Sequence, residues 1–212
     1  MIPFDAIRNP HLEKAAAELY SDELPYHNFS HVLATLAAGA VLVDRCNKAG
    51  IPIDAEAVYY ALLFHDAGYH ENHRSRGFDS KEEYSAHLAA QCLQAEAISE
   101  DTIRKVTAAI LSTKRDAEYS SNEEKAVRAA DLAGLASEYE IFRAAVEKLR
   151  QEEEIVTGRK VAWDEWKTSV KETIRFYLGQ EIRFTQSEAF ADDPANFHAK
   201  AAQNLSRLLG ED

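Results

Sequence analysis

The fold is decided by an apolar run that ends in two polar residues, Tyr59-Tyr60-Ala61-Leu62-Leu63-Phe64-His65-Asp66-Ala67-Gly68. On a helix, His65 follows Leu62 by three positions and Asp66 follows Leu63 by three, so both polar side chains continue apolar rows. A buried carboxylate without a partner costs several kcal/mol, which is comparable to the whole stability of a small domain. Asp66 must therefore be protonated, ion-paired or bound to a metal, and the neighbouring histidine favours a metal.

Composition and charge bound the kind of protein. The chain has 212 residues, of which 46% are hydrophobic, and this is enough for one domain with a substantial core. The net charge of -12 works against binding to a long nucleic acid, because polyanions are bound by clustered Lys and Arg. A small anionic substrate stays compatible with this charge, since a metal can invert the field inside a pocket.

The amino terminus and the apolar runs indicate a cytoplasmic protein with no membrane partner. Residues 1–5 lack the basic and apolar regions of a signal peptide. The longest wholly apolar run, residues 57–64, is well short of the ~20 residues needed to span a bilayer. Two cysteines, Cys46 and Cys92, are too few for a disulfide framework and are expected to be small buried groups.

Helical periodicity continues through the chain, and no stretch alternates convincingly with period two. The first helix is expected over residues 5–20. Later helices are expected to begin at five capping residues, Asp54, Ser80, Ser99, Asn122 and Asp193. The sequence therefore predicts an all-α protein built as a bundle of several helices.

No linker or internal repeat divides the chain, so a single structural domain is expected. Within it, residues 1–150 would form a metal-binding helical core, and residues 151–212 a helical extension packed on that core. The charged run over residues 147–154 is interpreted as a solvated helix face.

Further polar residues lie on faces that should be buried. His27 and His31 are four apart at the start of the second helix, and His31 directly precedes an apolar stripe that begins at Val32. Asp131 is surrounded by apolar residues on its helix. Ordinary explanations exist, since a core histidine is usually hydrogen-bonded and Asp131 could pair with Arg128.

Taken together, these anomalies suggest one site. His31, His65, Asp66 and Asp131 would supply two neutral imidazoles and two carboxylates, whose charge balances a divalent cation. Such a mixed set favours octahedral Mn²⁺, Mg²⁺, Fe²⁺ or Co²⁺, one per chain, and leaves about two positions for water or substrate. An open metal site of this kind is a candidate catalytic site.

The order of these residues resembles the HD-domain superfamily of metal-dependent phosphohydrolases. A set of shorter matches is similar to a group of small bacterial proteins described as predicted metal-dependent HD phosphohydrolases, and it spans nearly the whole chain. The matching segments are Tyr26-His27-Asn28, Phe64-His65-Asp66, Gly68-Tyr69, Glu82 with Ser85-Ala86, Thr113-Lys114, Asp131-Leu132-Ala133 and Ala202-Gln203-Asn204-Leu205. The resemblance implies an HD-type helical fold that hydrolyses a phosphoester by means of a metal-activated water.

The resemblance also implies roles for individual residues. Asp66 is the first candidate for the catalytic base and Glu82 is the second. Lys114, His27 and His70 are expected to bind a small phosphorylated substrate, with Lys114 neutralising phosphoryl oxygens. For Lys114 a surface salt bridge is the ordinary alternative, and for His70 it is solvent exposure without a role.

Lys81, Asp116 and Ala129 depart from the group's pattern while the four expected ligands are kept. These departures modestly favour a sensor that binds a metal or nucleotide without hydrolysis. Oxidation chemistry at a di-iron site is another alternative, since related helical folds include oxygenases. A helical interaction protein without a metal is a third, and the C-terminal helical segment could mediate a homodimer.

Overall fold

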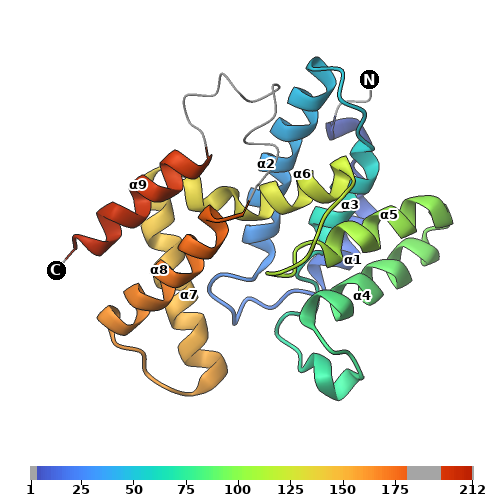
Figure 1. Ribbon diagram of the computed structural model, residues 1–212. Coiled ribbons are helices and arrows are strands. Elements are labelled where there is room, and N and C mark those ends of the chain that lie inside the picture. Colours follow the sequence, from blue (N-terminus) through green and yellow to red (C-terminus); the bar gives the residue numbers. More distant parts are fainter. Residues whose placement is uncertain (1–3, 181–196, 212) are drawn as a thin grey trace. The chain divides into compact units, whose positions relative to one another are not determined.

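The computed structural model describes residues 4–180 and 197–211, and this part of the chain contains helices and no strand, which confirms the all-α prediction (Figure 1). The elements in chain order, with η for 3-10 helices, are η1 (Phe4–Ile7), α1 (Pro10–Ala17), α2 (Phe29–Lys48), α3 (Ala55–Phe64), η2 (His73–Arg76), α4 (Lys81–Ala95), α5 (Glu100–Leu111), α6 (Asn122–Asp131), η3 (Leu132–Ala136), α7 (Tyr139–Thr157), α8 (Trp163–Leu178) and α9 (Phe197–Leu209).

Contacts among these helices divide the chain into two compact units. The N-terminal unit contains the residues up to Asp131 except Leu24–Tyr26, and the C-terminal unit contains Leu24–Tyr26 and the residues from Leu132 on. The division falls after Asp131, earlier in the chain than the expected boundary near residue 150. The assignment of a core and an extension within one structural domain stays a prediction.

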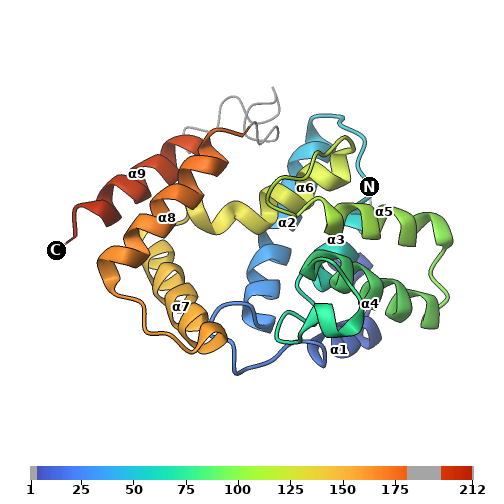
Figure 2. The same cartoon turned by 60° about the horizontal axis from the view of Figure 1, so that its bottom comes forward.

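The centre of the N-terminal unit is α3, which carries the apolar run. Every residue from 57 to 64 is at most 3% exposed. The helices α2, α4, α5 and α6 all contact α3, and Figure 2 shows it among them. A helix that is apolar on all sides has to be covered on all sides, and this is why the other helices of the unit surround α3.

Side-chain caps begin most of the helices. Asp54, Ser80 and Ser99 each accept a hydrogen bond from a backbone N–H three residues on, as the sequence predicts. The cap of α6 is Ser121 rather than Asn122, because the Ser121 hydroxyl accepts from the N–H of the residue three further on at 3.1 Å. Both are good capping residues, so their adjacency leaves the choice to the tertiary structure.

The beginning and the end of the chain differ from the expectation in other ways. The expected helix over residues 5–20 is divided into η1 and α1, because Asn9 caps a new helix with Pro10 at its first position. The expected cap Asp193 lies outside the described residues, and α9 is described from Phe197.

Gly68 makes the sharp turn that follows α3. Its φ of +73° is a conformation that glycine adopts without strain, and a Cβ at this position would lie 2.6 Å from a ring carbon of Tyr84. The Gly68 N–H donates to the carbonyl oxygen of Leu19 at 2.9 Å. The turn therefore fixes the backbone immediately after His65 and Asp66.

Among the described helices, α2 has the length and hydropathy of a membrane-crossing helix. Its buried stripe, which includes Val32 and Val43, packs inside the N-terminal unit, where α2 contacts α3 and α6. Because a core helix passes the same test of length and composition, this property is weak support for a membrane span.

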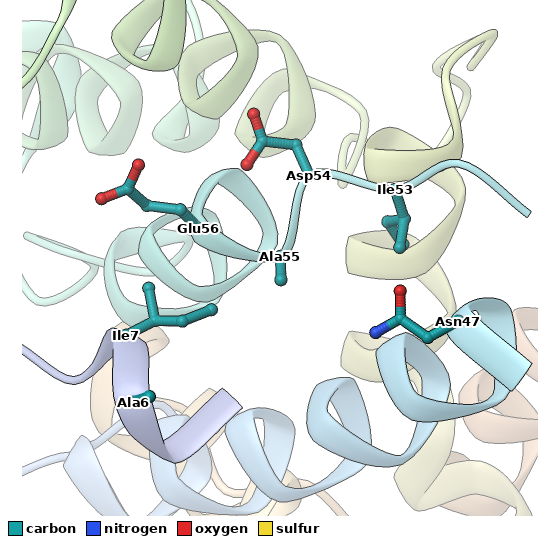
Figure 3. A pocket seen from close by; sticks show the side chains of 7 residues that line it. All are labelled: Ala6, Ile7, Asn47, Ile53, Asp54, Ala55 and Glu56. Atoms are coloured by element: carbon teal, nitrogen blue, oxygen red, sulfur yellow. The ribbon is translucent and has the colours of Figure 1, made fainter. Parts of the chain in front are cut away.

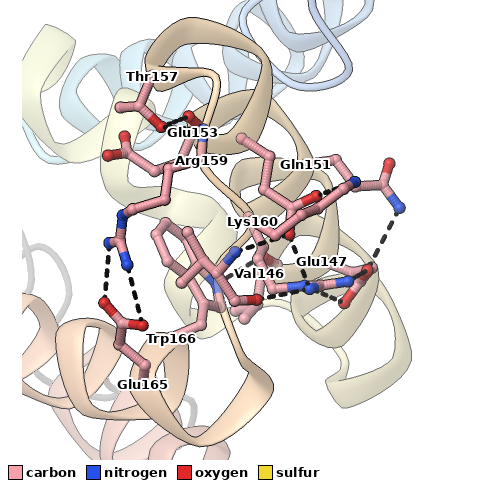
Figure 4. Close-up of polar contacts among 12 residues, drawn as sticks. Val146, Glu147, Gln151, Glu153, Thr157, Arg159, Lys160, Glu165 and Trp166 are labelled. Atoms are coloured by element: carbon pink, nitrogen blue, oxygen red, sulfur yellow. Dashed lines mark hydrogen bonds and ion pairs between the residues drawn. The ribbon is translucent and has the colours of Figure 1, made fainter.

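The C-terminal unit is built around an apolar core on α7, α8 and α9. The core residues are Tyr139, Phe142, Val146, Val170, Ile174, Leu205 and Leu208. Figure 4 shows how α7 and α8 are joined, with the indole N–H of Trp166 donating to the carbonyl oxygen of Val146 at 2.9 Å and Arg159 pairing with Glu165 at 2.8 Å.

The charged run on α7 is a solvated face only in part. Arg150 pairs with Glu147 at 2.7 Å and with Glu154 at 3.1 Å near the surface. Glu152, in contrast, is 3% exposed, and its carboxylate accepts a hydrogen bond from the backbone N–H of Tyr26 at 3.0 Å. The expectation of a solvated face is therefore wrong for Glu152.

Candidate metal centre

Three helix ends bring four of the expected site residues to one place. His31 lies in the first turn of α2, His65 caps the C-terminal end of α3, and Asp131 is the last residue of α6. Asp66 follows His65 directly in the chain. Because α2, α3 and α6 all contact one another, these ends converge inside the N-terminal unit.

The spacing of the four side chains fits a single cation. One nitrogen or oxygen atom from each lies within 4.8 Å of the others. His65 Nε2 is 3.1 Å from Asp66 Oδ2 and 3.3 Å from His31 Nε2, and His31 Nε2 is 3.3 Å from Asp131 Oδ1. Two neighbouring ligands that each lie ~2.1 Å from a divalent cation are about 3.0–3.4 Å apart.

The orientation of His65 suits a metal ligand. His65 Nδ1 lies 2.8 Å from the carbonyl oxygen of Leu62. Since a carbonyl oxygen only accepts, Nδ1 carries the proton, and in the neutral ring Nε2 presents its lone pair to the cluster. The Tyr20 hydroxyl donates to the next carbonyl, that of Leu63, at 3.0 Å. Two C-terminal carbonyls of α3 are thereby satisfied, and the histidine ring is held in place.

The electrostatics of the cluster favour a bound positive charge. Burial lowers the pKa of His65, but the carboxylates of Asp66 and Asp131 outweigh burial and raise that pKa well above its ordinary value. Burial raises the pKa of Asp66, whereas His65, His27 and His31 lower it to about 2. Burial likewise raises the pKa of Asp131, and hydrogen bonds from His31 and His65 bring it well below the ordinary value. Both carboxylates are ionised at neutral pH, so the cluster requires a proton or a cation.

The other four expected site residues, of which Lys114 is described below, lie outside this group of four. Glu82 is half-buried in the first turn of α4, and His70 is exposed after the turn at Gly68. His27 is closer, with its ring centre 5.9 Å from that of His31. The structure therefore places His27 beside the cluster and His70 at the surface.

Lys114 follows α5, and its backbone is held by a buried arginine that the sequence did not assign to the site. The ammonium of Lys114 pairs with Glu83 at 2.7 Å. Arg128 is 1% exposed, and its guanidinium donates to the carbonyl oxygens of residues 112–114 and to that of Arg115 at 2.8 Å. The sequence signal for this role is an arginine inside an apolar stretch, which needs several acceptors when buried.

The N-terminal unit also contains a cavity that is unrelated to the cluster. Figure 3 shows this cavity, of about 570 Å³, which is lined by Ala6, Ile7, Asn47, Ile53, Asp54, Ala55 and Glu56. None of the expected site residues lines it. The Asp54 carboxylate already has structural partners, since it caps α3 and pairs with Lys105 at 2.8 Å.

Comparison with known proteins places the fold. The structure of the Leishmania phosphodiesterase LmjPDEB1 in complex with IBMX matches with a TM-score of 0.63 and 13% sequence identity, over 98% of this chain and 86% of that chain. No family model matches the chain. No curated protein matches it in sequence. At this identity the likeness concerns the fold, which is all-helical and contains a His/Asp cluster that could hold a metal.

Proposed function

We propose that the protein is a metal-dependent phosphohydrolase that cleaves a phosphate mono- or diester of a small phosphorylated metabolite. The observation that carries the proposal is the cluster of two imidazoles and two ionised carboxylates at the ends of three helices. The likeness of the fold to a phosphodiesterase supports the same class of reaction.

His31, His65, Asp66 and Asp131 would hold the ion, and their charge suits a divalent cation. When bound, such a cation lowers the pKa of a water molecule and polarises a phosphoryl oxygen. The carbonyl oxygen of Leu62 keeps the His65 ring in the tautomer that ligation needs. These four residues would therefore position the reacting groups as well as bind the ion.

Proton transfer from the attacking water is assigned to Glu82 ahead of Asp66. A pKa of about 2 keeps Asp66 ionised, which suits a ligand, but a group with so low a pKa accepts protons poorly at neutral pH. Glu82 is a half-buried carboxylate in the first turn of α4. It lies outside the group of four, so it would not also have to act as a ligand.

Two other side chains would act on the substrate. The ring of His27 lies beside His31 at 5.9 Å, and an imidazole is the side chain best suited to give a proton to a leaving group near neutral pH. Lys114 would neutralise phosphoryl oxygens after exchanging its ion pair with Glu83 for the substrate. His70, which is exposed, would contribute at most at the entrance to the site.

Metal analysis followed by an activity screen tests the proposal. Protein purified without chelator should carry about one equivalent of metal and, with Mn²⁺, Mg²⁺, Fe²⁺ or Co²⁺, release phosphate from monoesters or a monoester and an alcohol from diesters. Asp66→Asn should lose both properties, and Asp44→Asn, an exposed change on α2, should keep both. Metal-free wild-type protein, or full turnover by Asp66→Asn, would contradict the proposal.

A sensor without hydrolysis is the second candidate. The ion pair between Lys114 and Glu83 favours it, because this cation is already occupied. The departures at Lys81, Asp116 and Ala129 point the same way. A sensor would bind metal and phosphorylated ligands without turning any of them over.

A di-iron oxygenase is less well supported. In the described residues the cluster contains four ligand-type side chains, whereas a two-iron site of the helical-bundle type uses about six. The other expectations, which are a possible homodimer, a cytoplasmic location and no nucleic-acid or membrane partner, stay predictions.

A further inference from the structure

A row of three side chains extends from the cluster. The ring of Tyr69 stacks on His27, with ring centres 3.8 Å apart and planes 15° apart. The ammonium of Lys81 lies 3.2 Å from the centre of the same tyrosine ring. Two groups this close to one ring centre cannot share a face, so His27 and Lys81 cover opposite faces of Tyr69. The ammonium is therefore about 7 Å from the His27 ring.

The inner end of this row is fixed to the cluster. His27 lies 5.9 Å from His31, ring centre to ring centre. The Tyr69 N–H donates to the carbonyl oxygen of Asp66 at 3.1 Å, immediately after the turn at Gly68. The packed rings of His27 and Tyr69 therefore hold the Lys81 ammonium in a defined position.

Lys81 is also an unusual choice for its place in the helix. It is the first residue of α4, where the helix dipole favours negative charge, and the two residues after it are Glu82 and Glu83. A residue that departs from a local rule beside a candidate site is a candidate for a functional role. The positive end of α4 and the ammonium attract the same kind of ligand, an anion.

From this row, and given the proposed phosphohydrolase function, we infer that Lys81 determines specificity by binding a second anionic group of the substrate. The scissile phosphate would lie at the cluster, and a further phosphate or carboxylate would reach past His27 and Tyr69 to the ammonium. Both faces of Tyr69 are covered, so a nucleobase cannot stack on this ring. This side of the site would therefore recognise the substrate by its negative charge. The substrate class is therefore a phosphorylated metabolite with two separated anionic groups.

Isothermal titration of the metal-loaded protein tests this inference without requiring turnover. The probes are alkane bisphosphonates of increasing chain length, each compared with the alkyl monophosphonate of the same length. In the wild type, at least one bisphosphonate should bind about tenfold more tightly than its matched monophosphonate. Lys81→Met should abolish that preference without weakening monophosphonate binding, and Lys81→Arg should keep it.

The matched control removes a positive charge elsewhere. Lys48 is the last residue of α2, about 25 Å along the helix from His31, and is exposed. Lys48→Met should leave the preference unchanged. The inference is overturned if Lys81→Met keeps the preference, if Lys48→Met loses it equally, or if no bisphosphonate is preferred by the wild type.

Failure of the proposed function would look different. In that case the wild type lacks metal or does not hydrolyse any ester. If the wild type holds metal and releases phosphate while Lys81→Met keeps the preference, only the role of Lys81 fails. With active protein, Lys81→Met should raise the KM of a substrate with two anionic groups about tenfold and leave the kcat for a simple monoester unchanged.

Discussion

The two units differ in how many charged side chains they bury together. In the N-terminal unit, two imidazoles and two carboxylates are crowded together, with His65 1% exposed. In the described part of the C-terminal unit the core is apolar, and the buried carboxylate of Glu152 accepts a hydrogen bond from the backbone N–H of Tyr26. The ion pair of Arg159 with Glu165 in that unit lies at the surface.

This difference separates a structural charge from a functional one. Glu152 meets a donor from the chain itself, so its burial is balanced within the fold. Asp66 and Asp131 face two imidazoles whose remaining lone pairs need a proton or a cation, so the fold leaves part of the balance to a ligand. The candidate metal centre is therefore distinguished by having more buried hydrogen-bond acceptors than the protein has donors for them.

The largest expected effect comes from removing one ligand. His65→Gln should reduce bound metal and lower any phosphohydrolase activity at least ~100-fold, because the cluster loses the nitrogen that Leu62 orients. The matched change in the other unit, Glu152→Gln, should keep the metal and the activity. Metal content by mass spectrometry and phosphate release measure both variants, and the comparison breaks if Glu152→Gln loses as much metal as His65→Gln.

The next largest effect concerns buried and exposed arginines. Arg128→Met should lower the free energy of unfolding by about 3 kcal/mol, because the carbonyls at the C-terminal end of α5 lose their donors. Arg159→Met, which breaks an exposed pair with Glu165, should cause no measurable change. Urea unfolding followed by circular dichroism gives both values. Equal effects from the two variants would show that burial does not distinguish these arginines.

Metal removal should have a smaller effect, a decrease in Tm that becomes larger as pH rises. The raised pKa of His65 means that its proton stabilises the metal-free fold fully below the ordinary value of ~6.5, and this stability is lost as pH rises through the folded pKa. A bound cation takes the place of that proton. The Tm of chelator-treated protein should therefore fall with rising pH, and metal should restore roughly 5–10 °C on the alkaline side.

The control for metal removal is Asp131→Asn. This variant lacks one of the two carboxylates that raise the His65 pKa, so its chelator-treated form should depend less on pH. The difference in Tm between metal-loaded and chelator-treated protein should grow as pH rises. A difference in Tm that becomes smaller would contradict the assignment of the cluster as a metal site.

How far the sequence predicted the structure depends on how local each signal is. Asp54, Ser80 and Ser99 were predictable as caps, because a capping side chain and the backbone N–H that donates to it are three residues apart. His65 and Asp66 were conspicuous because polar residues continued apolar rows of one helix. The convergence of His31 and Asp131 with them could be expected only as a hypothesis, since it depends on how three helices pack.

The partners of buried charged residues could not be predicted from the neighbouring sequence. Glu152 looked like part of a solvated run because its partner, the Tyr26 N–H, is 126 positions away in the chain. The sequence allowed a pair between Arg128 and Asp131, but the acceptors of Arg128 are backbone carbonyls at the end of another helix. The sandwich around Tyr69 likewise joins His27 and Lys81 across long sequence distances.

The smallest expected effect lies in the C-terminal unit and has the opposite pH dependence. Burial raises the pKa of Glu211, but the Tyr139 hydroxyl and the Arg143 guanidinium outweigh burial and lower the pKa below its ordinary value. The stabilisation from Glu211 is therefore present above about pH 5 and is lost as pH falls through the folded pKa. The expected contribution is below ~1 kcal/mol, because the group is partly solvated.

Urea unfolding of wild type and Glu211→Gln can measure this contribution in the C-terminal unit alone, because both tryptophans, Trp163 and Trp166, lie there and report by fluorescence. The difference between the two proteins should be constant from neutral pH to about pH 5.5 and shrink below it. A difference that grows on acidification would mean that Glu211 is stabilised in its protonated form. The C-terminal unit would then share the requirement for a proton that distinguishes the cluster around His65.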